Sequence, residues 1–64
     1  MNANELFKGT TIKHHSGRLY KVLLLANIVH TDKFPLTCVY VSQVTGEIYA
    51  RPVNDMLDKF EVVR

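Results

Sequence analysis

The stretch 18–29 limits the possible folds of this chain more than any other feature, because it contains neither glycine nor proline and is rich in aliphatic side chains. Its alternation with a period of two predicts a long β-strand. The face predicted to point into a core carries Tyr20, Val22, Leu24, Ala26 and Ile28. The opposite face is more apolar than the solvated face of a small antiparallel sheet usually is. We therefore expect a homodimer contact there through Leu23, Leu25 and Val29, with the curvature of a closed barrel as the alternative cover.

Size sets a second constraint, because a domain of 64 residues buries only about 60% of the surface that its unfolded chain exposes. Cys38 is the only cysteine, so no disulfide within the chain can compensate. We expect residues 1–64 to form one small domain, stabilised by sheet closure or by oligomerisation, with Cys38 packed as a small apolar side chain. A lone cysteine, no secretion signal and no apolar run of membrane-spanning length together predict a cytoplasmic protein, in the host cytoplasm if phage-encoded, without a membrane partner.

Turn signals divide the chain into short strands, which are predicted over 10–15, 18–29, 36–44, 47–51 and 60–63. A helical turn over 5–8 is expected to plug one end of the core with Leu6 and Phe7. Apolar residues from Val53 to Phe60 follow a helical spacing and predict one further helical turn. The pattern predicts a mostly β fold, a small SH3-like antiparallel barrel with a short helical turn before the last strand.

Tyr49 and Arg51 are two residues apart on a predicted strand, so their side chains share a face with Glu47, whereas Ile48 and Ala50 are left for the core. A guanidinium group suits phosphate or carboxylate, and a phenol ring offers a stacking surface. The pair is therefore a candidate ligand-binding surface. In the alternative interpretation, Arg51 forms an ion pair with Glu47 or with an acid near the end of the sequence, and Tyr49 covers the barrel.

Lys13, His14 and His15 form a second candidate, because a cation and two imidazoles lie shortly before Gly17 and together suggest an anion cradle. His14 is predicted to point toward the core on the same side as Ile12, while Lys13 points outward. His14 is either a satisfied structural residue or a group at a pocket rim, where its charge would make ligand binding depend on pH near neutrality. Tyr20 is a further candidate for stacking.

Metal binding and catalysis are not expected. The possible zinc ligands do not follow a paired-ligand spacing; they are His14, His15, His30 and Cys38. The sequence contains no nucleophile elbow, phosphate loop or paired carboxylates, and so small a core scarcely encloses a water-excluding site. We predict no enzyme activity, no metal and no cofactor.

Three segments, 13–23, 39–40 and 46–52, resemble the bacterial and phage family of short proteins called domain of unknown function sixteen fifty-three. The positions that carry the resemblance are His14, Gly17, Tyr20, Val22, Ala26, Tyr40, Tyr49, Arg51 and Pro52. The chain departs from the family pattern at Ser16, where the family has lysine, at Tyr49, where it has a tryptophan-like position, and at Ile28, where histidine is frequent. The resemblance implies a small SH3-like β-barrel and no established activity.

These features favour a non-catalytic binding module, bacterial or phage-encoded, that binds or sequesters a nucleotide-like or other phosphate-bearing small molecule to modulate a host process. Lys13, His14 and Arg51 would bind the anion while Tyr20 or Tyr49 stacks. One alternative is a small barrel that binds nucleic acid, although a formal net charge of +2 is too small to indicate this alone. Another is a protein-interaction adaptor that uses the apolar face.

Overall fold

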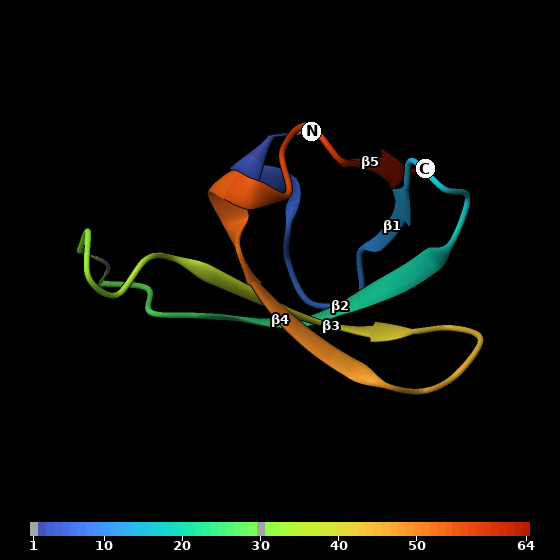
Figure 1. Ribbon diagram of the computed structural model, residues 1–64, viewed down its shortest axis with the longest axis horizontal. Helices are drawn as coiled ribbons and strands as arrows, with labels where there is room; N and C mark the ends of the chain where they lie inside the picture. The colour runs from blue at the N-terminus through green and yellow to red at the C-terminus, as the bar shows by residue number, and fades with distance from the viewer. Residues whose placement is uncertain (1, 30) are drawn as a thin grey trace.

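The chain folds into a single antiparallel sheet with two short 3-10 turns (Figure 1). The computed structural model describes residues 2–29 and 31–64. Within them the strands are β1 (Thr11–His14), β2 (Leu19–Ala26), β3 (Thr37–Ser42), β4 (Ile48–Pro52) and β5 (Phe60–Val63). The 3-10 turns are η1 (Ala3–Glu5) and η2 (Val53–Asp55). The prediction of a mostly β fold with a helical turn before the last strand is confirmed.

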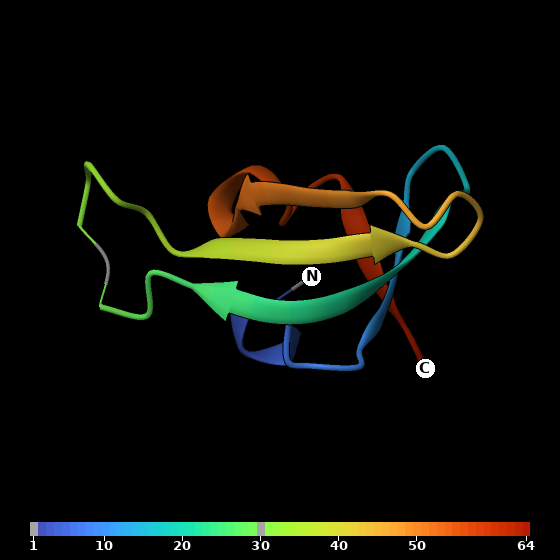
Figure 2. The ribbon, with the colours of Figure 1, turned by 90° about the horizontal axis from the view of Figure 1, so that it is seen from below.

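The strand order is β4-β3-β2-β1-β5, with β4 and β5 at the two edges. Figure 2 shows β2, β3 and β4 running side by side, while β1 and β5 cross above one end of this layer in Figure 1. In the part of the chain that the structure describes, no strand pairing joins β4 to β5. The sheet is strongly curved but not closed, so the predicted SH3-like barrel is not confirmed.

Local sequence explains where the strands turn. Gly17 and Gly46 lie between strands with φ angles of 96° and 77°, a left-handed conformation that glycine adopts without steric cost. Asn27 follows the last residue of β2 and has a φ of 60°, and its side-chain amide donates to the carbonyl of Pro35 at 3.0 Å. The predicted strand over 18–29 is therefore too long at its far end.

The core lies between the two layers and comprises Leu6, Ile12, Tyr20, Val22, Cys38, Tyr40, Val53, Met56 and Phe60. Burial raises the pKa of the Cys38 thiol to about 11, so this group stays uncharged and packs as an apolar side chain, as predicted. Leu6 follows η1 into the core, whereas Phe7 remains 66% exposed. The prediction that both residues plug the core is right for Leu6 and wrong for Phe7, because the chain reverses at once through a hydrogen bond from Thr10 N to Phe7 O.

A β-bulge in β2 changes which side chains point inward. Val22 pairs with Tyr40, but the next pair is Leu24 with Val39, so Leu23 is an extra residue on β2. An extra residue shifts the alternation of side chains by one position. Leu25 consequently packs against the core, while Leu24 is 51% exposed.

The bulge corrects the core face predicted for β2 and changes the setting of the predicted dimer contact. The predicted core face is right for Tyr20 and Val22 and wrong for Leu24, and Ile28, beyond the strand, is 65% exposed. Of the predicted dimer contact, Leu23 is half-buried and Leu25 is engaged by the core, which leaves Val29 as its exposed member. The three residues do not form one open apolar face.

Leu25→Ala is expected to lower the free energy of unfolding by about 1–2 kcal/mol, because a half-buried leucine loses part of the about 2–5 kcal/mol that a buried one loses. Leu24→Ala is the matched control and is expected to change stability by less than about 0.5 kcal/mol. Urea unfolding of both variants measures the difference. Equal losses of unfolding free energy in the two variants would contradict the finding that Leu25 faces the core and Leu24 faces outward.

Candidate functional site

One pocket collects aromatic and basic side chains from all five strands and from the turn between β1 and β2. Its volume is about 220 Å³. The residues that line it are His14, Arg18, Tyr20, Tyr40, Tyr49, Arg51 and Phe60. We call this the aromatic–basic pocket. Four of the five predicted ligand-binding residues meet there: His14, Tyr20, Tyr49 and Arg51.

Four aromatic rings form the floor and one wall of this pocket. Tyr20, Tyr40 and Phe60 are buried and meet edge to face, with ring centroids 5.2 to 5.8 Å apart. Tyr49 lies opposite Tyr40 in the β3–β4 register and stacks on its ring at 5.7 Å. These contacts fix the ring planes before any ligand arrives, since offset and edge-to-face pairs are the favoured aromatic geometries.

The ring cluster also decides which face of β4 points inward. Tyr49 is 39% exposed and leans on the core, whereas Ile48 is 65% exposed and Ala50 is exposed. The prediction that Ile48 and Ala50 face the core is therefore wrong. The inner layer is built from aromatic residues, and the β4 face with Tyr49 and Arg51 completes it.

Two guanidinium groups border the pocket. Arg18 and Arg51 are exposed, and neither is part of the two ion pairs found among the described residues, Lys13–Glu61 and Arg64–Glu5. Burial raises the pKa of the Tyr40 hydroxyl, while the charge of Arg51 and its hydrogen bond to that hydroxyl act in the opposite direction. Glu47 instead accepts a hydrogen bond from the Tyr49 hydroxyl at 3.0 Å. Arg51 therefore presents a positive charge beside the rings that no ion pair among the described residues neutralises.

His14 is half-buried at the edge of the pocket, where its ring meets Phe60 edge to face at 4.9 Å. The backbone N–H of Ser16 donates to His14 Nδ1 at 3.2 Å. Because Nδ1 accepts this bond, the ring proton of neutral His14 is on Nε2. Burial lowers the pKa of His14, and the positive charges of His15, Arg18, Arg51 and Lys59 lower it further.

Lys13 is the predicted site residue that the structure places elsewhere. It pairs with Glu61 across β1 and β5, with Nζ 3.4 Å from Oε1. It lines a separate cavity of about 240 Å³ with His15, Lys59 and Glu61 among its neighbours. Adjacent residues on a strand point to opposite faces, so Lys13 and His14 do not form one anion cradle.

Sequence reasoning missed three pocket residues, namely Arg18, Tyr40 and Phe60. Arg18 precedes Tyr20 by two residues, and the same period-two argument that paired Tyr49 with Arg51 would have found it. Tyr40 follows from the strand register, which is a long-range property. Phe60 was predicted to end a helical stripe and to begin the last strand, and it does begin β5. Its place in the pocket depends on the pairing of β5 with β1, which sets it opposite His14.

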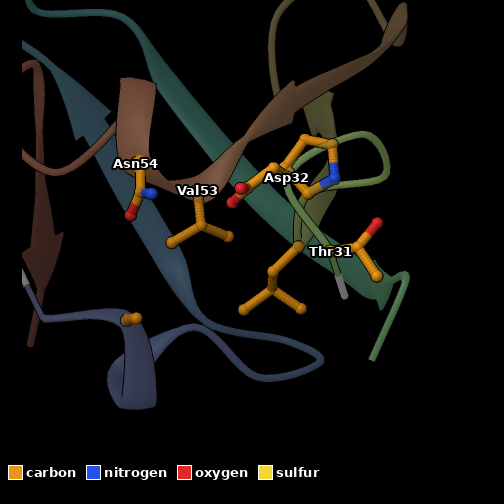
Figure 3. A pocket seen from close by; sticks show the side chains of 7 residues that line it. Thr31, Asp32, Val53 and Asn54 are labelled. Atoms are coloured by element: carbon orange, nitrogen blue, oxygen red, sulfur yellow. The ribbon is translucent and has the colours of Figure 1, made fainter. Parts of the chain in front are cut away.

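A larger cavity of about 520 Å³ lies between η2 and the loop before β3, and Figure 3 shows Val53 and Asn54 on one side of it and Thr31 and Asp32 on the other. Asp32 is the only charged side chain among the described residues that line it. A negative charge there opposes an anionic ligand, so this cavity is not the candidate site despite its size.

Among the described residues, no three His, Cys, Asp or Glu side chains gather as metal ligands. His30, named above as a possible zinc ligand, lies outside the residues that the structure describes. In residues 2–29 and 31–64, no helix has the length and hydrophobicity required to cross a membrane.

Comparisons of the chain with protein-family models, curated proteins and solved structures find no match. The resemblance to domain of unknown function sixteen fifty-three therefore stays a prediction.

The ring protons of His14 are expected to titrate with a midpoint below 6.5, the ordinary pKa of histidine, because burial and four nearby cations disfavour its charged form. Arg51→Ala removes one of these cations and is expected to raise the midpoint. NMR titration of the two proteins measures the change, with Lys13→Ala as the control variant. Equal shifts in the two variants would contradict the placement of Arg51 beside His14.

The same depressed pKa predicts how stability varies with pH. The unfolded chain takes up a proton near pH 6.5 that folded His14 does not yet bind, so this contribution to stability is complete above 6.5 and declines as the pH falls below it. His14→Gln is expected to flatten that part of the curve of unfolding free energy against pH. An unchanged curve would contradict the assignment.

Proposed function

We propose that this protein is a non-catalytic binding module that holds a nucleotide-like, phosphate-bearing small molecule in the aromatic–basic pocket. One observation carries the proposal: two guanidinium groups that form no ion pair with a carboxylate of the described residues border a cluster of preorganised aromatic rings. This combination supplies both parts of nucleotide recognition, charge for the phosphate and a stacking surface for the base.

Arg18 and Arg51 are suited to the phosphate. Each guanidinium presents a planar fork of N–H donors that matches two phosphate oxygens, and charge-assisted hydrogen bonds of this type are stronger than neutral ones. His14 adds its Nε2–H as a neutral donor. A dianionic group also lowers the mutual repulsion of the cations gathered there, which favours binding over the empty state.

The base would occupy the neighbouring cavity of about 340 Å³, which shares Arg18, Tyr20 and Tyr49 with the pocket and continues to Ser42 and Thr45. The aromatic–basic pocket alone, at about 220 Å³, is smaller than the roughly 300 Å³ at which small-molecule sites begin. The two cavities together suit a nucleotide better than either alone. Tyr49, partly exposed between them, is the stacking residue.

The wider setting of this module is part of the same proposal. The strand order, the bend in β2 and the 3-10 turn before β5 support an SH3-like barrel. We place the protein in the cytoplasm of a bacterium or, if phage-encoded, of its host, where sequestering a nucleotide would modulate a host process.

Binding of single-stranded nucleic acid is the second candidate, favoured by the basic side chains around His14, because the charges of Arg18, Arg51 and Lys59 all act on that ring. Small barrels often bind single strands with stacking aromatics in a basic groove. These charges gather around one residue, so a compact ligand is the better fit.

Arg51→Ala and Arg18→Ala are each expected to weaken the binding of nucleoside monophosphates by about tenfold or more, since losing a charge-assisted hydrogen bond costs about 1.5–3 kcal/mol. Lys13→Ala removes an equal charge outside the pocket and is expected to change affinity by less than about threefold, which is under 1 kcal/mol. Calorimetry with adenosine, guanosine, cytidine and uridine 5′-monophosphates, and with inorganic phosphate alone, measures this. An equal loss in Lys13→Ala would indicate nonspecific charge attraction and overturn the pocket assignment.

Salt dependence separates the two candidates. Nucleic-acid binding weakens steeply with ionic strength, with a slope that counts the neutralised phosphates, whereas a single nucleotide gives a shallow slope. Titrations of an oligothymidylate and of the best monophosphate at several salt concentrations measure both. Tighter binding of the oligonucleotide with a steep slope would favour the second candidate over the first.

A further inference from the structure

Strand β4 is an edge of the sheet, and its outward backbone groups can be assigned from the hydrogen bonds around it. Ser42 N donates to Glu47 O at 2.9 Å, and Val53 N donates to Leu36 O at 2.9 Å. Bonding to a neighbouring antiparallel strand alternates from residue to residue. Tyr49 and Arg51 therefore bond inward to β3, and the N–H and C=O groups of Ile48 and Ala50 point out from the edge.

The outer face of the sheet beside this edge is apolar. Leu24, Val39 and Ala50 lie side by side in one cross-strand row, and Val41 lies beside Ile48 in the next. Ile48 is 65% and Leu24 51% exposed. An edge strand with unpaired backbone groups next to apolar side chains is a template for another strand.

We propose that a second copy of this chain pairs with that edge, β4 against β4 in antiparallel orientation, with the two-fold axis at Tyr49. In this register Ile48 lies opposite Ala50 of the partner subunit, and each of the two pairs exchanges N–H···O=C bonds. Glu47 lies opposite Arg51 of the partner subunit, and the symmetry repeats this pair. Opposite charges that face each other across strands stabilise a sheet.

The sequence of β4 singles out this register. With the axis at Ala50, Ile48 would face Pro52 of the partner subunit, which has no N–H to donate. With the axis at Ile48, Glu47 would face Tyr49 of the partner subunit and no charge pair would form. Only the Tyr49 register matches each charge with its opposite and leaves Pro52 beyond the paired residues, so the strand is complementary to itself. A two-fold contact requires this of a single patch.

The arrangement also replaces the predicted contact through Leu23, Leu25 and Val29 with one that the core does not use. On the outer face, it extends the apolar rows across the axis. On the inner face, it brings the two Tyr49 side chains to either side of the axis, and the two aromatic–basic pockets come with them. This dimer is independent of the proposed function, because its test measures the mass of the assembly and uses no ligand.

Sedimentation velocity at protein concentrations up to about 1 mM tests the proposal, since weak dimers have dissociation constants in this range. The chain is expected to shift from monomer to dimer as concentration rises. Ala50→Pro removes an outward N–H and is expected to stay monomeric, whereas Ala50→Ser keeps that N–H and is expected to dimerise. Circular dichroism confirms that both variants are folded. A monomer at every concentration, or equal association of the two variants, would overturn the proposal.

A charge exchange tests the register independently of any proline effect. Glu47→Arg and Arg51→Glu are each expected to weaken the dimer by about tenfold, through the repulsion of like charges across the axis. The double variant E47R/R51E restores opposite pairs and is expected to recover most of the association. Asp58→Arg, an equal change of charge away from the edge, is the control and should leave association unchanged. A double variant no better than the single ones would overturn the register.

Discussion

The bulge at Leu23 is the constraint on which the rest of the structure depends. Before it, β2 pairs with both β1 and β3; after it, β2 pairs with β3 alone. A bulge bends its strand and increases the local twist. Here the bend lets one long strand serve two layers, and the core of a 64-residue chain forms between them. Without the bend, the inner aromatic face would stay open to water.

Much of the fold could be predicted from local signals. Turn residues such as Gly17 and Gly46 marked the strand ends, and Tyr20 and Val22 were placed in the core by alternation. The errors begin where alternation breaks. The side chains of 22–25 do not reveal the bulge, because each is aliphatic and suits either face of the sheet. Whether Leu24 or Leu25 faces the core therefore depends on how β2 pairs with β3. Whether the sheet closes is equally a long-range property.

Part of the candidate site could also be predicted from the sequence. Period-two spacing correctly placed Tyr49 with Arg51, and the structure adds Tyr20 and His14 to them. The structure places Lys13 outside this pocket, because neighbouring residues on a strand point to opposite faces, a rule that already applied to the sequence. Tyr40 could not be found in this way, since its place beneath Tyr49 is set by the β3–β4 register.

Arg51 connects the pocket with the edge of the sheet. Its side chain shares the inner face with Tyr49, while the backbone groups of its neighbour Ala50 point outward along the edge. A guanidinium paired with Glu47 of a partner subunit is less available to a phosphate, and a phosphate bound at Arg51 weakens the attraction to that carboxylate. Linkage makes such an effect reciprocal: any factor by which dimerisation changes ligand affinity is the factor by which the ligand changes dimerisation. The two proposed binding events would thus be coupled through one side chain, because the inner face and the free edge belong to the same short strand.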